Sequence, residues 1–307
     1  MSNTNAEKEW IRRYGVQKTV AKTCEKGNGF GDIAGMGELK ELITEGFINV
    51  LKNRQYADAF GIKPPALLLY GPAGCGKTFF AEKMAEEVGI NFVKVVPDDL
   101  ACTWVHGTQQ KIGELFKSAE KNAPTILFFD EFDAMVPRRT GGEGNQHYDS
   151  EVNEFLCMLN NAADRGVYVL AATNHPERID KAVLRTGRID EMVYIDMPDL
   201  EARKGILDLA LSKLPTDEGI DTQKLAEQTR GFNCSDIRYI ISTAARKMFN
   251  ATIRDKSGQL HNISQSLLED IISKRSPSVS SRDIREYERV RSEFSPKEGK
   301  RVTVGFG

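Results

Sequence analysis

Several features that would assign a chain to a particular class of protein are missing from this sequence. No apolar run approaches the ~20 residues that a membrane-spanning helix needs, so we expect no membrane partner. The amino-terminal residues Met1 to Glu7 lack the apolar core of a signal peptide. The 5 cysteines are scattered without Cys-x-x-Cys spacing, which indicates neither a zinc site nor a disulfide framework. We therefore expect a cytoplasmic protein.

The sequence also lacks a strong charge of either sign. Its 42 basic and 44 acidic residues are mixed along the chain and give a net charge of −2. Long-range attraction to nucleic acid or to an anionic membrane is therefore not expected to drive binding, although a local basic patch is compatible with these totals. The hydrophobic content of 40% and the charged content of 28% are ordinary for a globular protein.

Short apolar segments alternate with helical patterns through most of the chain. A helix is predicted over residues 37–53, and the pattern after Asp199 is helical as far as about Arg275, with a last helix over 281–294. The predicted strands are residues 66–70, 91–96, 125–130, 167–172 and 192–195. This alternation predicts an α/β fold, with a parallel sheet covered by helices on both faces.

The change of pattern after the last strand predicts two folded domains. Residues 30–199 are expected to form a large αβα domain, and residues 200–307 a small all-helical lid domain with a carboxyl-terminal helix and tail. Residues 1–29 are weakly patterned and are expected to form a flexible tail. The segment from Trp10 to Tyr14 is its best candidate for docking a partner.

Residues 71–78 read GPAGCGKT and form a phosphate-binding loop between a predicted strand and a predicted helix. Glycines allow the backbone N–H groups to point at phosphate oxygens, and the helix that follows adds the positive end of its dipole. Lys77 is expected to reach the β- and γ-phosphates, and the Thr78 hydroxyl to bind Mg²⁺. The sequence therefore predicts a binding site for a nucleoside triphosphate.

Two of the predicted strands end in polar residues, at the sheet edge where ligands of open α/β folds bind. Asp130 and Glu131 follow one strand; Asp130 is expected to hold Mg²⁺ through water, and Glu131 to polarise the attacking water. An acidic turn is the alternative. Asn174 ends the next strand and is expected to hydrogen-bond the attacking water or the γ-phosphate, with a turn-capping role before Pro176 as the alternative.

In this order, the motifs resemble those of an AAA ATPase. The matching segments are residues 32–36, 61–65, 71–78, 130–131, 172–174 and 184–190, within a stretch from about Phe30 to Asn250. The resemblance points to the clade that contains valosin-containing protein, spastin, katanin and the vacuolar-sorting ATPases, in a short single-ring form. It implies a large αβα domain, a small helical lid, ATP and Mg²⁺ bound between them, and a homo-hexameric ring.

The resemblance assigns roles to further residues. Arg185 and Arg188 match the arginine fingers that reach ATP in the neighbouring subunit, a surface salt bridge being the alternative for either. Cys75 stands near a helix N-terminus, where thiolates are favoured, so redox control is one interpretation and a tolerated small side chain the other. The expected nucleotide contacts besides Lys77, Thr78 and Asp130 are Asp32, Ile33, Ala34, Pro72, Ala73, Gly74, Cys75, Gly76, Phe79, Cys234 and Ser235.

The resemblance also implies how hydrolysis would do work. Trp104 and Val105 match the aromatic-apolar pair that lines the central pore and grips a protein client; packing of Trp104 into the core is the alternative. The predicted function is an ATP-hydrolysing motor that remodels or unfolds a dedicated protein partner, with HORMA-type signalling proteins, filament subunits and inhibited enzymes as candidates. A nucleotide-gated ring scaffold that threads no client is a second hypothesis. A nucleic-acid motor is a third, disfavoured by the near-neutral charge.

Overall fold

The computed structural model describes residues 22–23, 27–100, 107–138, 146–185, 187–255 and 259–294. The predicted pore residues Trp104 and Val105, and the predicted docking segment from Trp10 to Tyr14, lie outside these ranges. None of the helices within them combines the length and the apolar character needed to span a membrane.

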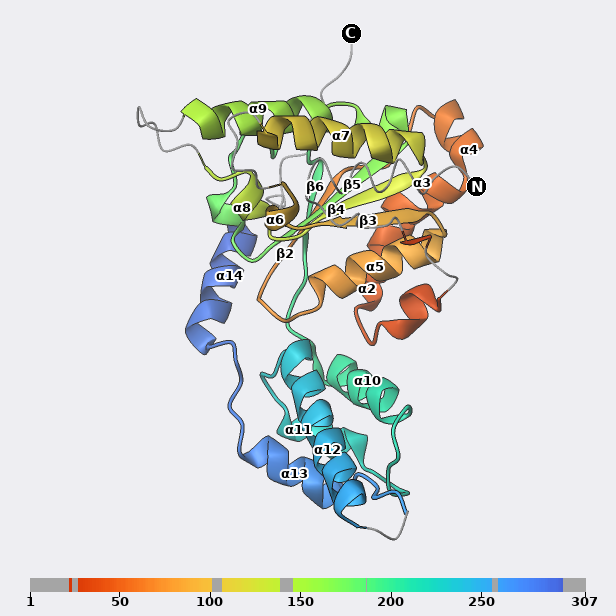
Figure 1. The fold of residues 1–307 in the computed structure, drawn as a ribbon, viewed down its shortest axis with the longest axis vertical. Helices are drawn as coiled ribbons and strands as arrows, with labels where there is room; N and C mark the ends of the chain where they lie inside the picture. The colour runs from red at the N-terminus through yellow and green to blue at the C-terminus, as the bar shows by residue number, and fades with distance from the viewer. Residues whose placement is uncertain are drawn as a thin grey trace.

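A single twisted sheet forms the centre of the larger part of the molecule (Figure 1). Its parallel strands lie in the order β3-β4-β5-β2-β6, so that β2 is flanked by β5 and β6. The strands are β2 (Leu67–Tyr70), β3 (Asn91–Val95), β4 (Thr125–Phe129), β5 (Val167–Thr173) and β6 (Glu191–Tyr194). The predicted strands and the α/β fold class are confirmed, and each strand end lies within one residue of its prediction.

A short additional strand, β1 (Lys22–Thr23), lies inside the segment predicted to be a tail. It pairs antiparallel with β3, through Lys22 opposite Phe92 and Thr23 opposite Asn91. Two residues are too few to carry a hydrophobic period, so the sequence pattern gave no signal for this strand. Its pairing covers part of the β3 edge, which would otherwise present unpaired backbone groups.

Helices cover both faces of the sheet (Figure 1). α7 (Gly107–Lys121) and α9 (Gln146–Leu159) lie along one face, and α5 (Lys77–Val88) lies on the other with α2 (Gly37–Ile43) and α3 (Asn49–Lys52). The predicted helix over 37–53 is thus interrupted, by a wider turn at Thr44–Ile48. The remaining short helices are η1 (Gly29–Asp32), α4 (Arg54–Ala59), α6 (Pro97–Leu100), α8 (Phe132–Met135), η3 (Ala162–Arg165) and η4 (Pro176–Arg178).

Strand β4 shows how the sequence builds the core on both faces. All of its residues are buried, and successive side chains of a strand point to opposite faces. Leu127 and Phe129 therefore pack beneath α7 and α9, whereas Ile126 and Phe128 pack beneath α5. A strand covered on both faces reads as a continuous apolar run, which is why it is recognisable in the sequence.

The helical part that follows has a core of its own. α10 (Leu200–Leu211), α11 (Thr222–Gln228), α12 (Cys234–Arg254) and α13 (Gln265–Ser273) surround residues such as Leu207, Ile240 and Leu268. Each helix begins after a capping side chain that accepts a backbone N–H from three residues further on, which satisfies an otherwise unpaired donor. The caps are Asp199, Asp221, Asn233 and Ser264.

The last helix, α14 (Ser281–Phe294), returns from this helical part to the sheet-containing part (Figure 1). The Tyr287 hydroxyl donates a hydrogen bond to the backbone oxygen of Asn174 at 3.0 Å. The Arg291 guanidinium lies 3.6 Å from the Asp196 carboxylate and 5.0 Å from the ring centre of Tyr194. The predicted lid domain includes this helix, whereas the contacts described here join it to the sheet-containing part.

Candidate nucleotide site

The carboxyl ends of three neighbouring strands meet around the GPAGCGKT loop. β2 leads into the loop, β4 ends just before Asp130 and Glu131, and β5 ends just before Asn174. Because β5 lies between β2 and β4 and all run parallel, the structure brings these groups together at one edge of the sheet. This is the edge at which open α/β sheets bind ligands.

Glycines shape the loop where other residues would clash. Gly71 has a φ of 146° and Gly74 a φ of 77°, values that side chains rarely adopt. A Cβ atom on Gly71 would lie 2.2 Å from the Ile195 carbonyl oxygen, and one on Gly74 would lie 2.5 Å from the amide nitrogen of Asn233. The loop is therefore packed against β6 and against α12 at positions where only glycine fits.

Lys77 lies buried at the start of α5. Its ammonium donates hydrogen bonds to the backbone oxygens of Gly71, at 2.8 Å, and of Pro72, at 2.9 Å. Burial lowers the pKa of Lys77 to about 8, because the charged form loses water. A phosphate anion inside the loop would favour the ammonium and oppose this shift, so the lysine is placed to respond to its ligand.

Thr78 and Asp130 meet at the predicted metal position. The Thr78 hydroxyl donates a hydrogen bond to the Asp130 carboxylate at 3.0 Å. Hydroxyl and carboxylate oxygens suit Mg²⁺, which usually binds through one or two protein groups together with phosphates and water. No cluster of three or more His, Cys, Asp or Glu side chains that could hold a metal occurs among the described residues. Thr78 and Asp130 therefore fit Mg²⁺, which would supply positive charge beside the phosphates.

Glu131 has an unusual backbone for a residue with a side chain. Its φ is 52° and its ψ is 45°, the left-handed conformation, and its N–H donates to the Asp130 carboxylate at 3.1 Å. The Glu131 side chain is exposed at the carboxyl edge, just before α8. Strained conformations of this kind cluster at functional sites. Here the strain turns the chain between the metal position and the helix.

Asn174 is held by groups that sequence reasoning missed. Its backbone oxygen accepts the hydrogen bond from Tyr287, 113 residues further along the chain. The preceding Thr173 donates its hydroxyl hydrogen to Asp133 and accepts the backbone N–H of His175 at 2.8 Å. No local pattern links such distant residues. These hydrogen bonds thus fix the backbone at the end of β5, next to the half-buried side chain of Asn174.

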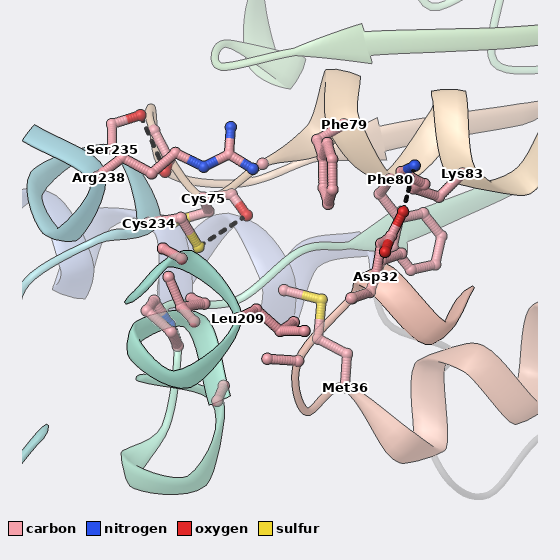
Figure 2. Close-up of a pocket in the computed structure, with 18 of the residues that line it drawn as sticks. Asp32, Met36, Cys75, Phe79, Phe80, Lys83, Leu209, Cys234, Ser235 and Arg238 are labelled. Atoms are coloured by element: carbon pink, nitrogen blue, oxygen red, sulfur yellow. Dashed lines mark hydrogen bonds and ion pairs between the residues drawn. The ribbon is translucent and has the colours of Figure 1, made fainter. Parts of the chain in front are cut away.

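A cavity of about 340 Å³ lies between the sheet-containing part and the lid helices (Figure 2). This volume falls within the range of small-molecule sites, roughly 300–1,000 Å³. The predicted nucleotide contacts that line it are Asp32, Ile33, Ala34, Gly74, Cys75, Gly76, Phe79, Cys234 and Ser235. Predicted contacts Pro72 and Ala73 belong to the same loop but are not among the lining residues.

The cavity walls also include residues that the sequence motifs did not indicate. The Arg238 guanidinium lies 4.7 Å from the ring centre of the half-buried Phe79, and Met36 and Leu209 face this pair across the cavity (Figure 2). Apolar and aromatic walls of this kind suit a flat aromatic base. The cavity is therefore shaped for a nucleoside that adjoins the phosphate loop.

Asp32 is tied to the protein through its side chain. Its carboxylate lies 2.6 Å from the Lys83 ammonium, and this hydrogen bond from Lys83 lowers the pKa of Asp32. Since the carboxylate already has a partner, Asp32 contributes to the cavity mainly by fixing the backbone before Ile33 and Ala34. Those residues then line the cavity beside α10.

The lid helix α12 donates hydrogen bonds directly to the carbonyl oxygens of the phosphate loop. The pairs are Asn233 Nδ2 to Ala73 O at 3.0 Å, Ser235 N to Gly74 O at 3.1 Å and Cys234 Sγ to Cys75 O at 3.5 Å. Figure 2 shows Cys234 and Ser235 turned toward the loop from α12. The start of the lid helix thus contacts the carbonyl oxygens of three successive loop residues.

Asp236 holds this lid contact in place. It is 1% exposed, completes the capping box with Asn233, and lies 2.8 Å from the Arg275 guanidinium. Ser278 donates to the same carboxylate through its N–H at 3.0 Å and its hydroxyl at 2.9 Å. Burial alone would raise the pKa of Asp236, but these hydrogen bonds outweigh it and the pKa is lowered.

The two cysteines at the loop are not activated thiols. Burial raises the pKa of Cys75 to about 12, and burial also raises the pKa of Cys234. Of the two interpretations of Cys75, the raised pKa favours the small side chain over redox control, because burial disfavours the thiolate. Cys75 acts as a small buried side chain, in contact with the sulfur of Met197 at 3.5 Å.

Arg185 and Arg188 lie at the opposite edge of the sheet. They precede β6, beside the amino end of β2, where Asp190 N donates to Ala66 O at 2.9 Å. Arg188 donates to Ala182 O at 2.7 Å and to the Asn160 side chain at 3.2 Å. The Arg185 backbone oxygen accepts the Arg188 N–H at 3.1 Å, but its exposed side chain has no hydrogen bond or ion pair to the described residues. The length of β2 alone separates the two edges by about 13 Å.

Comparison with known families agrees with this arrangement. Residues 67–197 match the family described as ATPase family associated with various cellular activities (AAA). The matched span runs from the start of β2 to just beyond β6 and includes the loop, Asp130, Glu131 and Asn174. This chain contains an AAA ATPase domain. ATP hydrolysis is the activity of such a domain, and nucleotide is its ligand.

Characterised relatives of this AAA domain come from distant organisms. The cell division cycle protein 48 homolog of Archaeoglobus fulgidus is 33% identical over 274 residues, 86% of this chain and 37% of the relative. The ATP-dependent zinc metalloprotease FtsH 3 of Symbiobacterium thermophilum is 32% identical over 294 residues, 94% of this chain and 46% of the relative. The ATPase family protein 2 homolog of Caenorhabditis elegans is 34% identical over 260 residues, which is 82% of this chain and 36% of the relative. The chain spans less than half the length of each relative.

Proposed function

We propose that this chain works as an ATP-driven motor that remodels or unfolds a protein partner, in a homo-hexameric ring. The position of Arg185 carries the proposal. The side chain of this arginine is exposed, has no partner among the described residues, and lies at the sheet edge opposite the phosphate loop. It cannot reach the nucleotide of its own chain, but a second copy can offer it to that site. A closed ring would repeat this contact around every interface.

The site residues divide the proposed reaction between them. Lys77 and the loop N–H groups would hold the phosphates, and Thr78 and Asp130 would hold Mg²⁺, Asp130 through water. Glu131 accepts a proton from the attacking water, and Asn174 orients that water. Arg185 from the neighbouring subunit stabilises negative charge on the departing phosphate, an effect worth roughly 10³–10⁵ in rate where arginine fingers operate. Arg188, the second predicted arginine finger, is hydrogen-bonded within its own chain, and we assign it the positioning of that loop in place of a direct contact with ATP.

The trans role of Arg185 can be tested by mixing two inactive variants. Glu131→Gln lacks the base but carries the arginine, and Arg185→Ala lacks the arginine but carries the base. If the arginine acts in trans, mixed rings contain interfaces with both groups, and phosphate release recovers on mixing. The matched control mixes Arg185→Ala with the double variant Glu131→Gln/Arg185→Ala, so that no subunit supplies the arginine. Absence of recovery in mixed rings of demonstrated composition would contradict the proposal.

The protein client is proposed on the resemblance of Trp104 and Val105 to pore residues. HORMA-type signalling proteins are one candidate class among dedicated partners. Glu131→Gln in ATP should hold a client in the pore, and the added Trp104→Ala change should release it. Affinity capture of both variants, followed by mass spectrometry, measures this difference. Equal capture by the two would favour a nucleotide-gated scaffold that threads no client.

A further inference from the structure

A lysine from a neighbouring strand lies on the carboxylate that is expected to serve Mg²⁺. Lys94 belongs to β3, which pairs in parallel with β4 through Lys94 opposite Phe128 and Val95 opposite Phe129. This register places Lys94 near the carboxyl end of both strands. Its ammonium lies 2.8 Å from Asp130 Oδ2, the same oxygen that accepts the Thr78 hydroxyl at 3.0 Å.

The surroundings of Asp130 make this ion pair part of the site and not a surface contact. The Asp130 side chain is 22% exposed, and that of Lys94 is 36% exposed. Lys77, from the loop, is close enough to Asp130 for the two charges to interact. Without a metal ion, the carboxylate is therefore already neutralised by a cation of the protein itself. A divalent cation that approaches this oxygen is repelled by the Lys94 ammonium.

We propose that Lys94 is an internal counter-ion that occupies the Mg²⁺-binding carboxylate of Asp130 and is displaced when Mg²⁺ binds with nucleotide. The inference rests on the metal site in the proposed function. The Lys94 ammonium would lower the affinity of the site for Mg²⁺ below the affinity that Thr78 and Asp130 would give without it. The site then resists Mg²⁺ until phosphate oxygens add their own negative charge, which couples metal binding to nucleotide binding.

Two substitutions separate charge from shape at this position. Lys94→Met keeps the length of the side chain and removes its charge, whereas Lys94→Arg keeps the charge. The full chain would be titrated with Mg²⁺ at a fixed concentration of a fluorescent, non-hydrolysable ATP analogue, so that binding and not activity is read. We expect Lys94→Met to lower the midpoint Mg²⁺ concentration by about tenfold, the order of effect for one nearby charge in a partly exposed site. Lys94→Arg should stay within about twofold of the parent chain, since it keeps the charge.

Two control substitutions show whether a change in the Mg²⁺ midpoint arises at the Asp130 site. Lys52→Met removes an ammonium that pairs with Glu87 at 3.2 Å and takes no part in the Asp130 contacts, so the midpoint should not move. A midpoint in Lys94→Met equal to or above that of the parent, with an unchanged melting temperature, would overturn the inference. Asp130→Asn should abolish the Mg²⁺ response. If it does not, the proposed metal site fails and the inference with it, a result distinguishable from failure of Lys94 alone.

Discussion

The phosphate loop is held from two sides, and both sides donate hydrogen bonds to its backbone oxygens. On the sheet side, Lys77 donates to Gly71 and Pro72, and Thr78 and Asp130 lie where Mg²⁺ is expected. On the lid side, Asn233 and its neighbours at the start of α12 donate to the oxygens of the next three loop residues. Because both sides hold one short backbone segment, a change of loop conformation on one side is transmitted to the other.

The two sides also differ in how they are stabilised. The sheet-side groups are polar atoms that are expected to bind the ligand, and they make few contacts with one another. The lid-side contact is anchored by the buried Asp236, whose hydrogen bonds reach Arg275 and Ser278 in the segment before α14. Substitutions on the first side should therefore change chemistry, and substitutions on the second side should change stability and coupling.

Between these two sides of the loop, the larger effect is expected on the sheet side, from loss of the catalytic base. Glu131→Gln should lower ATP hydrolysis by roughly 10²–10⁴, the usual contribution of a general base, and leave nucleotide binding intact. Steady-state phosphate release and equilibrium binding of a fluorescent nucleotide measure the two quantities. Glu201→Gln, at an exposed position of α10, is the control. Equal losses of binding and hydrolysis would show a structural role for Glu131 instead.

The next effect is expected on the lid side. Asp236→Ala leaves Arg275 and the donors of Ser278 without their buried acceptor, and should cost about 3 kcal/mol of unfolding free energy. Denaturant unfolding measures this loss. Asp208→Ala removes an exposed carboxylate that pairs with Lys204 at 3.1 Å and should change stability little. A small effect at Asp236 would mean that the lid contact is held mainly by its apolar core.

The lowered pKa of Asp236 gives this contribution a pH dependence of known sign. Its folded pKa lies below the ordinary value of 3.8, so the carboxylate stabilises the fold in full above that pH. The stabilisation is lost as the pH falls from 3.8 through the folded pKa, because the unfolded chain then binds a proton that the native carboxylate does not yet accept. The difference in unfolding free energy between the parent chain and Asp236→Asn should be constant near neutral pH and shrink below 3.8. A constant difference down to strongly acidic pH would contradict the assignment.

A smaller effect is expected where the lid-side segment reaches the sheet edge. Tyr287→Phe removes one hydroxyl donor to the Asn174 carbonyl and keeps the ring. A net hydrogen bond is worth about 1 kcal/mol, so kcat should fall by about fivefold if Tyr287 positions Asn174, with KM unchanged. Tyr239→Phe, at an exposed ring on α12, is the matched control. A fall in melting temperature with kcat unchanged would assign Tyr287 to structure alone.

The smallest effect concerns the thiols between the two sides. Because burial raises the pKa of Cys75 to about 12, almost no thiolate is present near neutral pH. Iodoacetamide should therefore modify the exposed Cys157 well before Cys75, as read by peptide mass spectrometry over time. Rapid modification of Cys75 in the folded chain would show that the lid opens often enough to expose the loop.

The sheet side could be predicted from the sequence, and the lid side largely could not. The strands β2, β4 and β5 are buried on both faces and read as apolar runs. Lys77, Thr78 and Asp130 belong to short motifs with fixed spacing. Contacts such as Tyr287 with Asn174 join residues 113 apart and depend on the path of the whole chain. Lys94 was also missed, because a lysine in a strand carries no signal until the strand order places it beside Asp130.

The return of α14 to the sheet-containing part has a mechanical consequence. The lid helices are joined to that part by one segment before α10 and by another between α13 and α14. A displacement of the lid helices therefore acts on both connections at once. Because α14 is tied to the sheet-containing part through Tyr287 and Arg291, such a displacement is also transmitted to the Asn174 carbonyl at the end of β5.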